Sequence, residues 1–181
     1  SCTPAEKGYY VSDGDRTKQI QCDEGRYSPG SGASECLDCA LGTYAKSKKA
    51  DRCELAERGH YVDKEGASEE KKCERGTFCK DEGQSSCLDA KPGHYVPSEG
   101  LSEERKCPAG KTSESAADEC EDCPDGSYAE DSGSPSCTLA NPGYFVSNDD
   151  KTRQRPCEKG FHAPGSGASE CLECALGTYA E

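Results

Sequence analysis

Apolar residues are sparse in this chain, and their most regular runs each begin at a glycine. Four runs place a glycine, two rings and a valine in succession: Gly8-Tyr9-Tyr10-Val11, Gly59-His60-Tyr61-Val62, Gly93-His94-Tyr95-Val96 and Gly143-Tyr144-Phe145-Val146. An acidic turn and then a basic stretch follow each run, as in Ser12-Asp13-Gly14-Asp15 before Arg16-Thr17-Lys18. Because Gly, Asp, Asn and Ser between strand-like runs are typical of hairpin turns, each segment is predicted to form a two-stranded hairpin with a charged tip.

The apolar pattern does not predict helices. No window sustains apolar residues at spacings of three and four, as an amphipathic helix would. All nine tyrosines and three phenylalanines instead lie one or two places after a glycine that itself follows a cysteine. We expect the glycine to turn the chain tightly there and the ring to lie over a nearby disulfide as a miniature core.

The composition indicates that disulfides take the place of a hydrophobic core. Leu, Ile, Val and Phe together account for only sixteen of 181 residues, while the chain has 15 cysteines. Such a composition is typical of a disulfide scaffold, and disulfides persist in oxidising compartments, so an extracellular or cell-surface location is predicted. The net charge of -13 argues against binding to nucleic acid or anionic lipid, and no apolar run is long enough to span a bilayer.

The chain repeats itself over a long superperiod. Residues 1–46 return as 136–181 with 29 of 46 positions identical. Two blocks alternate within the period: a short loop of the form C-x2-G-x-aromatic-x8-C, and a longer segment with nineteen residues between cysteines. We divide the chain into repeat 1 (1–52), a shortened repeat 2 (53–86), repeat 3 (87–136) and a truncated repeat 4 (137–181) that is equivalent to repeat 1.

Two disulfide pairings fit these spacings. If each short loop closes on itself, the bridges are Cys22–Cys36, Cys39–Cys53, Cys73–Cys87, Cys107–Cys120, Cys123–Cys137 and Cys157–Cys171. The rival scheme closes the long segments (Cys2–Cys22, Cys53–Cys73, Cys87–Cys107 and Cys137–Cys157) and forces Cys36–Cys39, Cys120–Cys123 and Cys171–Cys174 into local rings. We favour the first, because bridges between cysteines so close in sequence usually strain their geometry. It leaves Cys2 and Cys174 with partners outside this segment, and Cys79 either free or bonded to another chain.

One short loop with its continuation carries a resemblance to a known family. Cys22-Asp23-Glu24-Gly25-Arg26-Tyr27, followed by Gly32-Ala33-Ser34-Glu35-Cys36-Leu37-Asp38-Cys39-Ala40-Leu41-Gly42-Thr43-Tyr44, resembles the cysteine-rich repeats of ephrin-receptor and TNF-receptor ectodomains. The resemblance implies an elongated, β-rich rod of small modules in which each short loop is closed by its own two cysteines. This chain departs from the TNF-receptor pattern in the nineteen-residue segments, the shortened second repeat and the extra Cys79.

No catalytic or metal-binding constellation stands out. His60 and His94 occupy the position of Tyr9 and Tyr144, and His162 that of Tyr27, so we interpret them as ring substitutions. The close cysteine pairs lie too far apart for a zinc site and lack the strand–helix context of a thiol oxidoreductase. The acidic clusters Asp13–Asp15 and Asn148–Asp150 match no calcium-loop spacing and are expected to be solvated turns, or to pair with basic stretches of neighbouring subunits.

We therefore predict a small, disulfide-rich fold of β hairpins and loops, forming an elongated tandem-repeat rod with little helix and no large core. The expected function is that of an extracellular structural repeat protein, a subunit of a filament, appendage or surface coat that self-assembles with identical chains. The alternative is a receptor-like ectodomain whose modules bind a protein ligand. No enzyme activity, cofactor or metal is expected, and the many serines and threonines leave O-linked glycans open.

Overall fold

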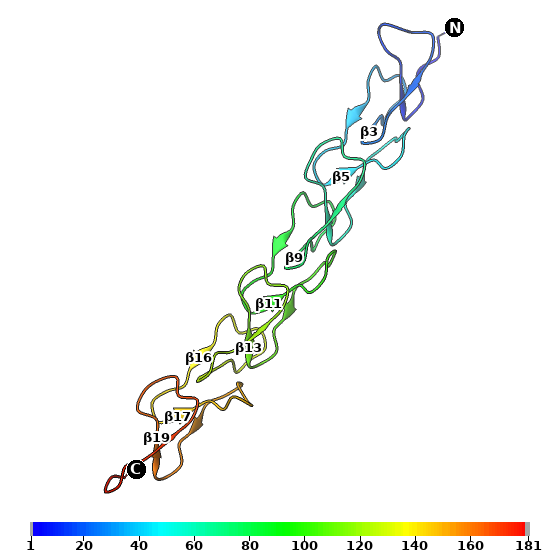
Figure 1. Cartoon of the computed structure of the whole chain (residues 1–181). Coiled ribbons are helices and arrows are strands. Elements are labelled where there is room, and N and C mark those ends of the chain that lie inside the picture. The colour runs from blue at the N-terminus through cyan, green and yellow to red at the C-terminus, as the bar shows by residue number, and fades with distance from the viewer. Residues whose placement is uncertain (1, 180–181) are drawn as a thin grey trace. The chain divides into compact units, whose positions relative to one another are not determined.

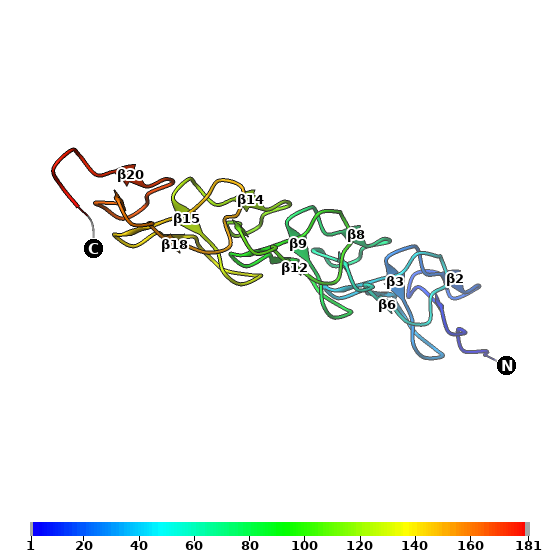
Figure 2. The same ribbon diagram turned by 90° about the horizontal axis from the view of Figure 1, so that it is seen from below.

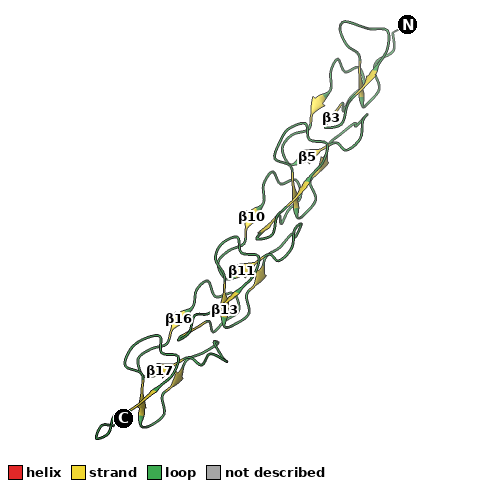
Figure 3. Ribbon diagram, viewed as in Figure 1, coloured by secondary structure: helices red, strands yellow, loops and turns green. Residues whose placement is uncertain are grey.

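The computed structural model describes residues 2–179, and within them the chain forms strands, turns and loops but no helix (Figure 3). Twenty strands of two residues each form ten two-stranded sheets, and each sheet joins strands that are consecutive in the chain (Figure 1). The strands are β1 (Tyr9–Tyr10), β2 (Ile20–Gln21), β3 (Arg26–Tyr27), β4 (Leu37–Asp38), β5 (Thr43–Tyr44), β6 (Glu54–Leu55), β7 (His60–Tyr61), β8 (Lys71–Lys72), β9 (Thr77–Phe78), β10 (Leu88–Asp89), β11 (His94–Tyr95), β12 (Arg105–Lys106), β13 (Lys111–Thr112), β14 (Glu121–Asp122), β15 (Ser127–Tyr128), β16 (Thr138–Leu139), β17 (Tyr144–Phe145), β18 (Arg155–Pro156), β19 (Phe161–His162) and β20 (Leu172–Glu173). The predicted fold class of disulfide-rich hairpins is confirmed.

One short hairpin is the repeating unit. A glycine with φ between +73° and +86° precedes the first strand of every hairpin. These glycines recur at a constant interval of seventeen positions, as from Gly8 to Gly25, with a single interval one position shorter between Gly110 and Gly126. The register is constant as well, since the residue after the glycine faces Gln21 in the first hairpin and Lys72 in the fourth. The short loop and the nineteen-residue segment of the sequence are therefore two versions of the same structural unit.

The glycine is required by the turn that begins each hairpin. At the first of them, the N–H of Tyr9 donates to the carbonyl of Glu6 at 3.0 Å, so Gly8 is the third residue of a four-residue turn, with φ +78°. A positive φ at that position is unfavourable for a residue that has a side chain, whereas glycine adopts it with almost no loss of free energy. The same hydrogen bond recurs at Gly59, where His60 donates to Glu57 at 2.9 Å.

The chain forms two compact units, described below, and within each of them main-chain hydrogen bonds join one hairpin to the next. The N–H of Gly25 donates to the carbonyl of Ala45 at 2.8 Å, and the N–H of Ala45 donates to Ala67 at 3.1 Å. In the other direction the N–H of Lys49 donates to the carbonyl of Cys22 at 2.9 Å. Because these bonds use backbone atoms only, the side chains between them can vary while the connection between hairpins is kept.

The chain forms two compact units. The first contains Ser1–Leu88 and Glu99–Glu103, and the second contains Asp89–Ser98 and Glu104–Glu181. Within each unit the hairpins follow one another in chain order (Figures 1 and 2). The predicted boundaries of four longer repeats stay a prediction.

The interior of each hairpin consists of small side chains. Ser28, Ala45, Val62 and Cys79 occupy equivalent positions and are at most 2% exposed. Of the aromatic side chains in the described residues, only those of Tyr44 and Phe78 are buried, and that rings lie over disulfides stays a prediction. The other aromatic side chains are partly or fully exposed. None of the described residues belongs to a helix that could cross a membrane.

Candidate functional site

Six disulfides each close one hairpin. They join Cys22–Cys36, Cys39–Cys53, Cys73–Cys87, Cys107–Cys120, Cys123–Cys137 and Cys157–Cys171. Their Cα atoms are 5.7 or 5.8 Å apart, within the range that disulfides prefer. The first cysteine lies three residues before the turn glycine and the second directly before the second strand, so the bond links the two ends of the loop. These are the pairs of the favoured scheme, in which each short loop closes on itself.

Four hairpins have no disulfide, and a hydrogen bond occupies the same place. A buried alanine stands at the position of the first cysteine (Ala5, Ala56, Ala90, Ala140), and glutamine or glutamate stands fourteen residues later (Gln19, Glu70, Glu104, Gln154). The side-chain oxygen accepts a bond from the N–H of the residue after the alanine: Glu6 to Gln19 at 2.9 Å, Glu57 to Glu70 at 2.7 Å, Lys91 to Glu104 at 2.8 Å and Asn141 to Gln154 at 2.8 Å. The loop is thus closed non-covalently.

This substitution does not stand out in the sequence. Alanine and glutamine are ordinary core and surface residues, and only their fixed spacing from the turn glycine identifies them. The constant interval between the glycines was the signal that could have revealed it.

Because the disulfide and the hydrogen bond close equivalent hairpins, we predict that a disulfide can be engineered into a hairpin that lacks one. The double variant Ala90→Cys/Glu104→Cys places cysteines at the two positions that are bridged in six other hairpins. We expect the bond to form on oxidative refolding and to raise the free energy of unfolding by about 3 kcal/mol, the value for closing a loop of this length. Non-reducing mass spectrometry and thermal unfolding measure both effects. The single variant Ala90→Cys is the control; stabilisation by the single variant alone, or two free thiols in the double variant, would contradict the equivalence.

Cys79 lies in the interior of its hairpin. Its side chain is 1% exposed, at the position that Val62 holds in the preceding hairpin, and its Sγ donates to the carbonyl of Ser86 at 3.3 Å. Burial raises the pKa of this thiol. Its sulfur lies within 4.8 Å of those of Cys73 and Cys87, which are bonded to each other. An inter-chain role for Cys79 stays a prediction, and it requires the thiol to leave this position.

The other two cysteines without a partner lie near the ends of the described chain. Cys2 is exposed and Cys174 is partly exposed, and neither forms a disulfide within residues 2–179. Cys174 stands at the first-cysteine position of the hairpin repeat. That their partners lie outside this segment remains an expectation.

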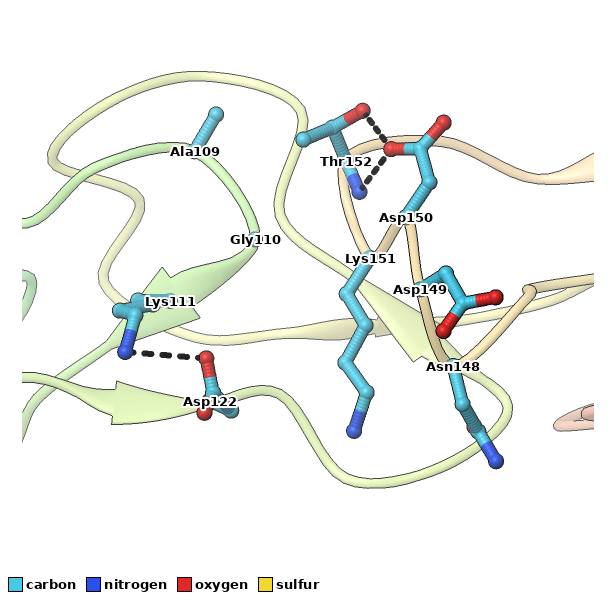
Figure 4. A pocket seen from close by; sticks show the side chains of 9 residues that line it. All are labelled: Ala109, Gly110, Lys111, Asp122, Asn148, Asp149, Asp150, Lys151 and Thr152. Atoms are coloured by element: carbon cyan, nitrogen blue, oxygen red, sulfur yellow. Dashed lines mark hydrogen bonds and ion pairs between the residues drawn. The ribbon is translucent and has the colours of Figure 1, made fainter.

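The predicted acidic turn at Asn148–Asp150 lines a shallow pocket of about 310 Å³ in the second unit, beside the hairpin of β13 and β14 (Figure 4). Of its charged groups, Lys111, Asp122, Asp150 and Lys151 are each paired within the chain. The Nζ of Lys151 donates to the carbonyl of Cys123 at 2.6 Å and to Asp125 at 2.9 Å, and Lys111 pairs with Asp122 at 3.0 Å. The lining residues include no histidine, cysteine or serine, and the hydroxyl of Thr152 donates to the carboxylate of Asp150.

Asp150 gives this turn a predicted pH dependence. Hydrogen bonds from Thr152 and Arg155 lower the pKa of Asp150 from 3.8 to about 2. Because the folded pKa is depressed, the contribution to stability is present above about pH 4 and is lost as the pH falls through about 2. Thr152→Val is expected to raise the pKa of Asp150 in an NMR titration, because the largest cause of its depression is removed. Thr17→Val, in the equivalent turn around Asp15, serves as the control and should leave Asp150 unchanged. An unaltered titration of Asp150 in Thr152→Val would show that the hydroxyl does not act on it.

The three histidines occupy ring positions, as the sequence predicts. His60 and His94 are the first residues of β7 and β11, as Tyr9 is of β1, and His162 is the second residue of β19, as Tyr27 is of β3.

The fold and its bonds define a class of protein, a tandem array of cysteine-rich hairpin modules. Residues 25–73 match the family model described as "Tyrosine-protein kinase ephrin type A/B receptor-like". The matched segment includes β3 to β8, and hence two hairpins with a disulfide and one without. The predicted cysteine-rich, ephrin-receptor-like modules are confirmed. Modules of this kind and dense disulfides are typical of extracellular domains. No curated protein matched the chain.

Proposed function

We propose that this chain is an extracellular structural repeat protein that forms part of a filament, appendage or surface coat by association of identical chains. The single observation that carries the proposal is the repetition of one hairpin with the same backbone bonds to its successor, as from Gly25 to Ala45 and from Gly110 to Ala129, both at 2.8 Å. Units that contact only their neighbours give an array whose length is set by the number of copies.

The chemistry of the surface and the interior supports a mechanical role. Covalent bonds and backbone hydrogen bonds provide the order. The proposal includes no enzyme activity. The strand and turn charges, such as Lys71 with Asp63 at 2.8 Å, are solvated pairs that contribute little to stability, and they are available to set register between chains.

Electron microscopy beside a non-reducing mass measurement tests the proposal. Protein secreted through an oxidising compartment is expected to form ordered assemblies at low salt and to lose them at high salt, if charge pairing sets the register. Dispersed monomers at every concentration and salt would count against assembly. Cys79→Ser distinguishes covalent cross-linking through Cys79 from non-covalent contacts between chains. If assemblies of this variant stay cross-linked, Cys79 does not form the inter-chain bond.

The family match favours a second function, a receptor-like ectodomain that binds a protein ligand. It covers residues 25–73, and ephrin-receptor-like modules occur in receptors by the description of that family. The two functions differ in their partner. A monomer that captures a distinct extracellular protein saturably favours the receptor, whereas binding to its own copies favours the structural role.

A further inference from the structure

We propose that Glu57, His60 and Glu70 form a binding site for a zinc ion in the hairpin of β7 and β8. One ligand atom from each of these residues lies within 4.8 Å of the other two. Imidazole nitrogen with carboxylate oxygen is a donor set that zinc accepts, whereas Ca²⁺ and Mg²⁺ prefer oxygen ligands alone. The proposal does not depend on whether the chain is a structural protein or a receptor.

The position of the His60 ring suits a metal ligand. Its Nδ1 lies 3.3 Å from the carbonyl oxygen of Arg58, to which an Nδ1–H can donate while Nε2 binds a metal ion. Metal-binding histidines commonly donate their second nitrogen to a backbone carbonyl in this way. Nε2 lies 3.9 Å from Oε1 of Glu70, a separation near the roughly 3.4 Å between ligand atoms of a tetrahedral zinc ion.

Glu70 is held in place by the hairpin itself. Its Oε2 accepts the bond from the N–H of Glu57 that replaces the disulfide, at 2.7 Å, which leaves Oε1 directed at His60. The side chains of His60 and Glu70 are only 19% and 17% exposed, so both are partly removed from water. Glu57 is exposed and can move toward the other two ligands, and a water molecule can complete the coordination.

The surroundings are negative. Burial raises the pKa of Tyr44, and the carboxylates of Glu70, Glu54 and Glu57 raise it further. Glu70 lies 3.9 Å from the ring of His60, which is positive only when it is protonated. A cation is therefore the group that would relieve the repulsion among these carboxylates.

The chain contains a matched hairpin that lacks one ligand. His94 and Glu104 repeat the positions of His60 and Glu70, and the Nδ1 of His94 lies 3.4 Å from the carbonyl of Pro92. At the position of Glu57, however, this hairpin has Lys91, whose Nζ lies 3.8 Å from Glu104. The lysine supplies a positive charge in place of a ligand, so this second hairpin is not expected to hold zinc.

The test adds zinc chloride to the oxidised chain after alkylation of accessible thiols and follows the histidine rings by NMR. Zinc is expected to shift the His60 ring at equimolar amounts and to leave the His94 ring unchanged. Glu57→Lys, which copies the second hairpin, should weaken the binding more than about 10-fold, since even the loss of an outer-shell partner has that effect. Lys91→Glu should create a second site and shift the His94 ring.

Two results would overturn the proposal. One is an equal response of His60 and His94 in the unaltered chain, which would indicate independent histidines. The other is unchanged zinc affinity in Glu57→Lys, whose fold is checked by its thermal unfolding. Magnesium chloride serves as the comparison probe, because binding as tight as that of zinc would exclude the ring as a ligand.

Discussion

Reduction of the six disulfides is expected to abolish the cooperative unfolding transition of this protein. Closing a loop of about 15 residues is worth on the order of 3 kcal/mol, and the chain buries mainly alanine, cysteine and valine, which offer little apolar area in return. The loss of several bridges therefore exceeds the roughly 5–15 kcal/mol that stabilises an ordinary domain. Differential scanning calorimetry before and after reduction and alkylation measures the effect.

A single hairpin offers the matched control. Cys39→Ala/Cys53→Gln replaces one disulfide with the alanine and glutamine that close the hairpin of Ala5 and Gln19. This variant is expected to fold and to lose about 3 kcal/mol of stability, because one loop is no longer cross-linked. A reduced and alkylated wild-type chain that keeps its heat-absorption peak would show that the bridges are dispensable.

The second large effect is expected from Gly42→Ala. A methyl group on Gly42, where φ is +77°, would overlap the carbonyl oxygen of Gly83, which belongs to the backbone and cannot rotate away. Two hairpins would have to separate, and the N–H of Gly42 would lose its bond to the carbonyl of Val62, now 2.9 Å long. We expect a loss of more than about 4 kcal/mol, a size that only such backbone or core disruptions reach.

Gly143→Ala separates the overlap from the strain of the dihedral angle. Gly143 has a φ of +81°, and a methyl group there would meet nothing within 4 Å. This variant should lose only the roughly 1–2 kcal/mol that a left-handed conformation costs an alanine. Denaturant unfolding of both variants gives the comparison. Equal losses would mean that the close approach of the backbones at Gly42 does not determine stability.

The sequence predicted the hairpins of the long segments and their charged tips because those features are local. The run Gly8-Tyr9-Tyr10-Val11 and the acidic turn after it determine their own conformation, and β1 and β2 lie where that pattern predicts them. The favoured disulfide pairs rested on local spacing in the same way. The cysteine spacing does not reveal the equivalence of all ten hairpins, because four of them contain no disulfide; only the constant interval between the turn glycines carries it.

In the candidate sites, too, the sequence predicts single residues but not which distant residues lie beside them. Cys79 stood out in the sequence as an odd thiol, but its burial follows from the interior position that Val62 and Val96 share with it. His60 lies at the ring position that the sequence predicts, whereas the sequence pattern does not connect its neighbours Glu57 and Glu70 with it. Glu70 comes beside His60 only because it replaces a cysteine, and that replacement is visible once the register of the hairpin repeat is known.

The exchange of a cysteine pair for alanine and glutamine has a consequence for biogenesis. Eight cysteines already permit about 105 connectivities, and each further pair multiplies the incorrect ones. Hairpins that close without a disulfide reduce the number of thiols that could pair incorrectly. Each disulfide that remains joins residues only 13 or 14 positions apart. In an oxidising compartment, bridges this local are expected to form one module after another, with little need for an isomerase to correct errors.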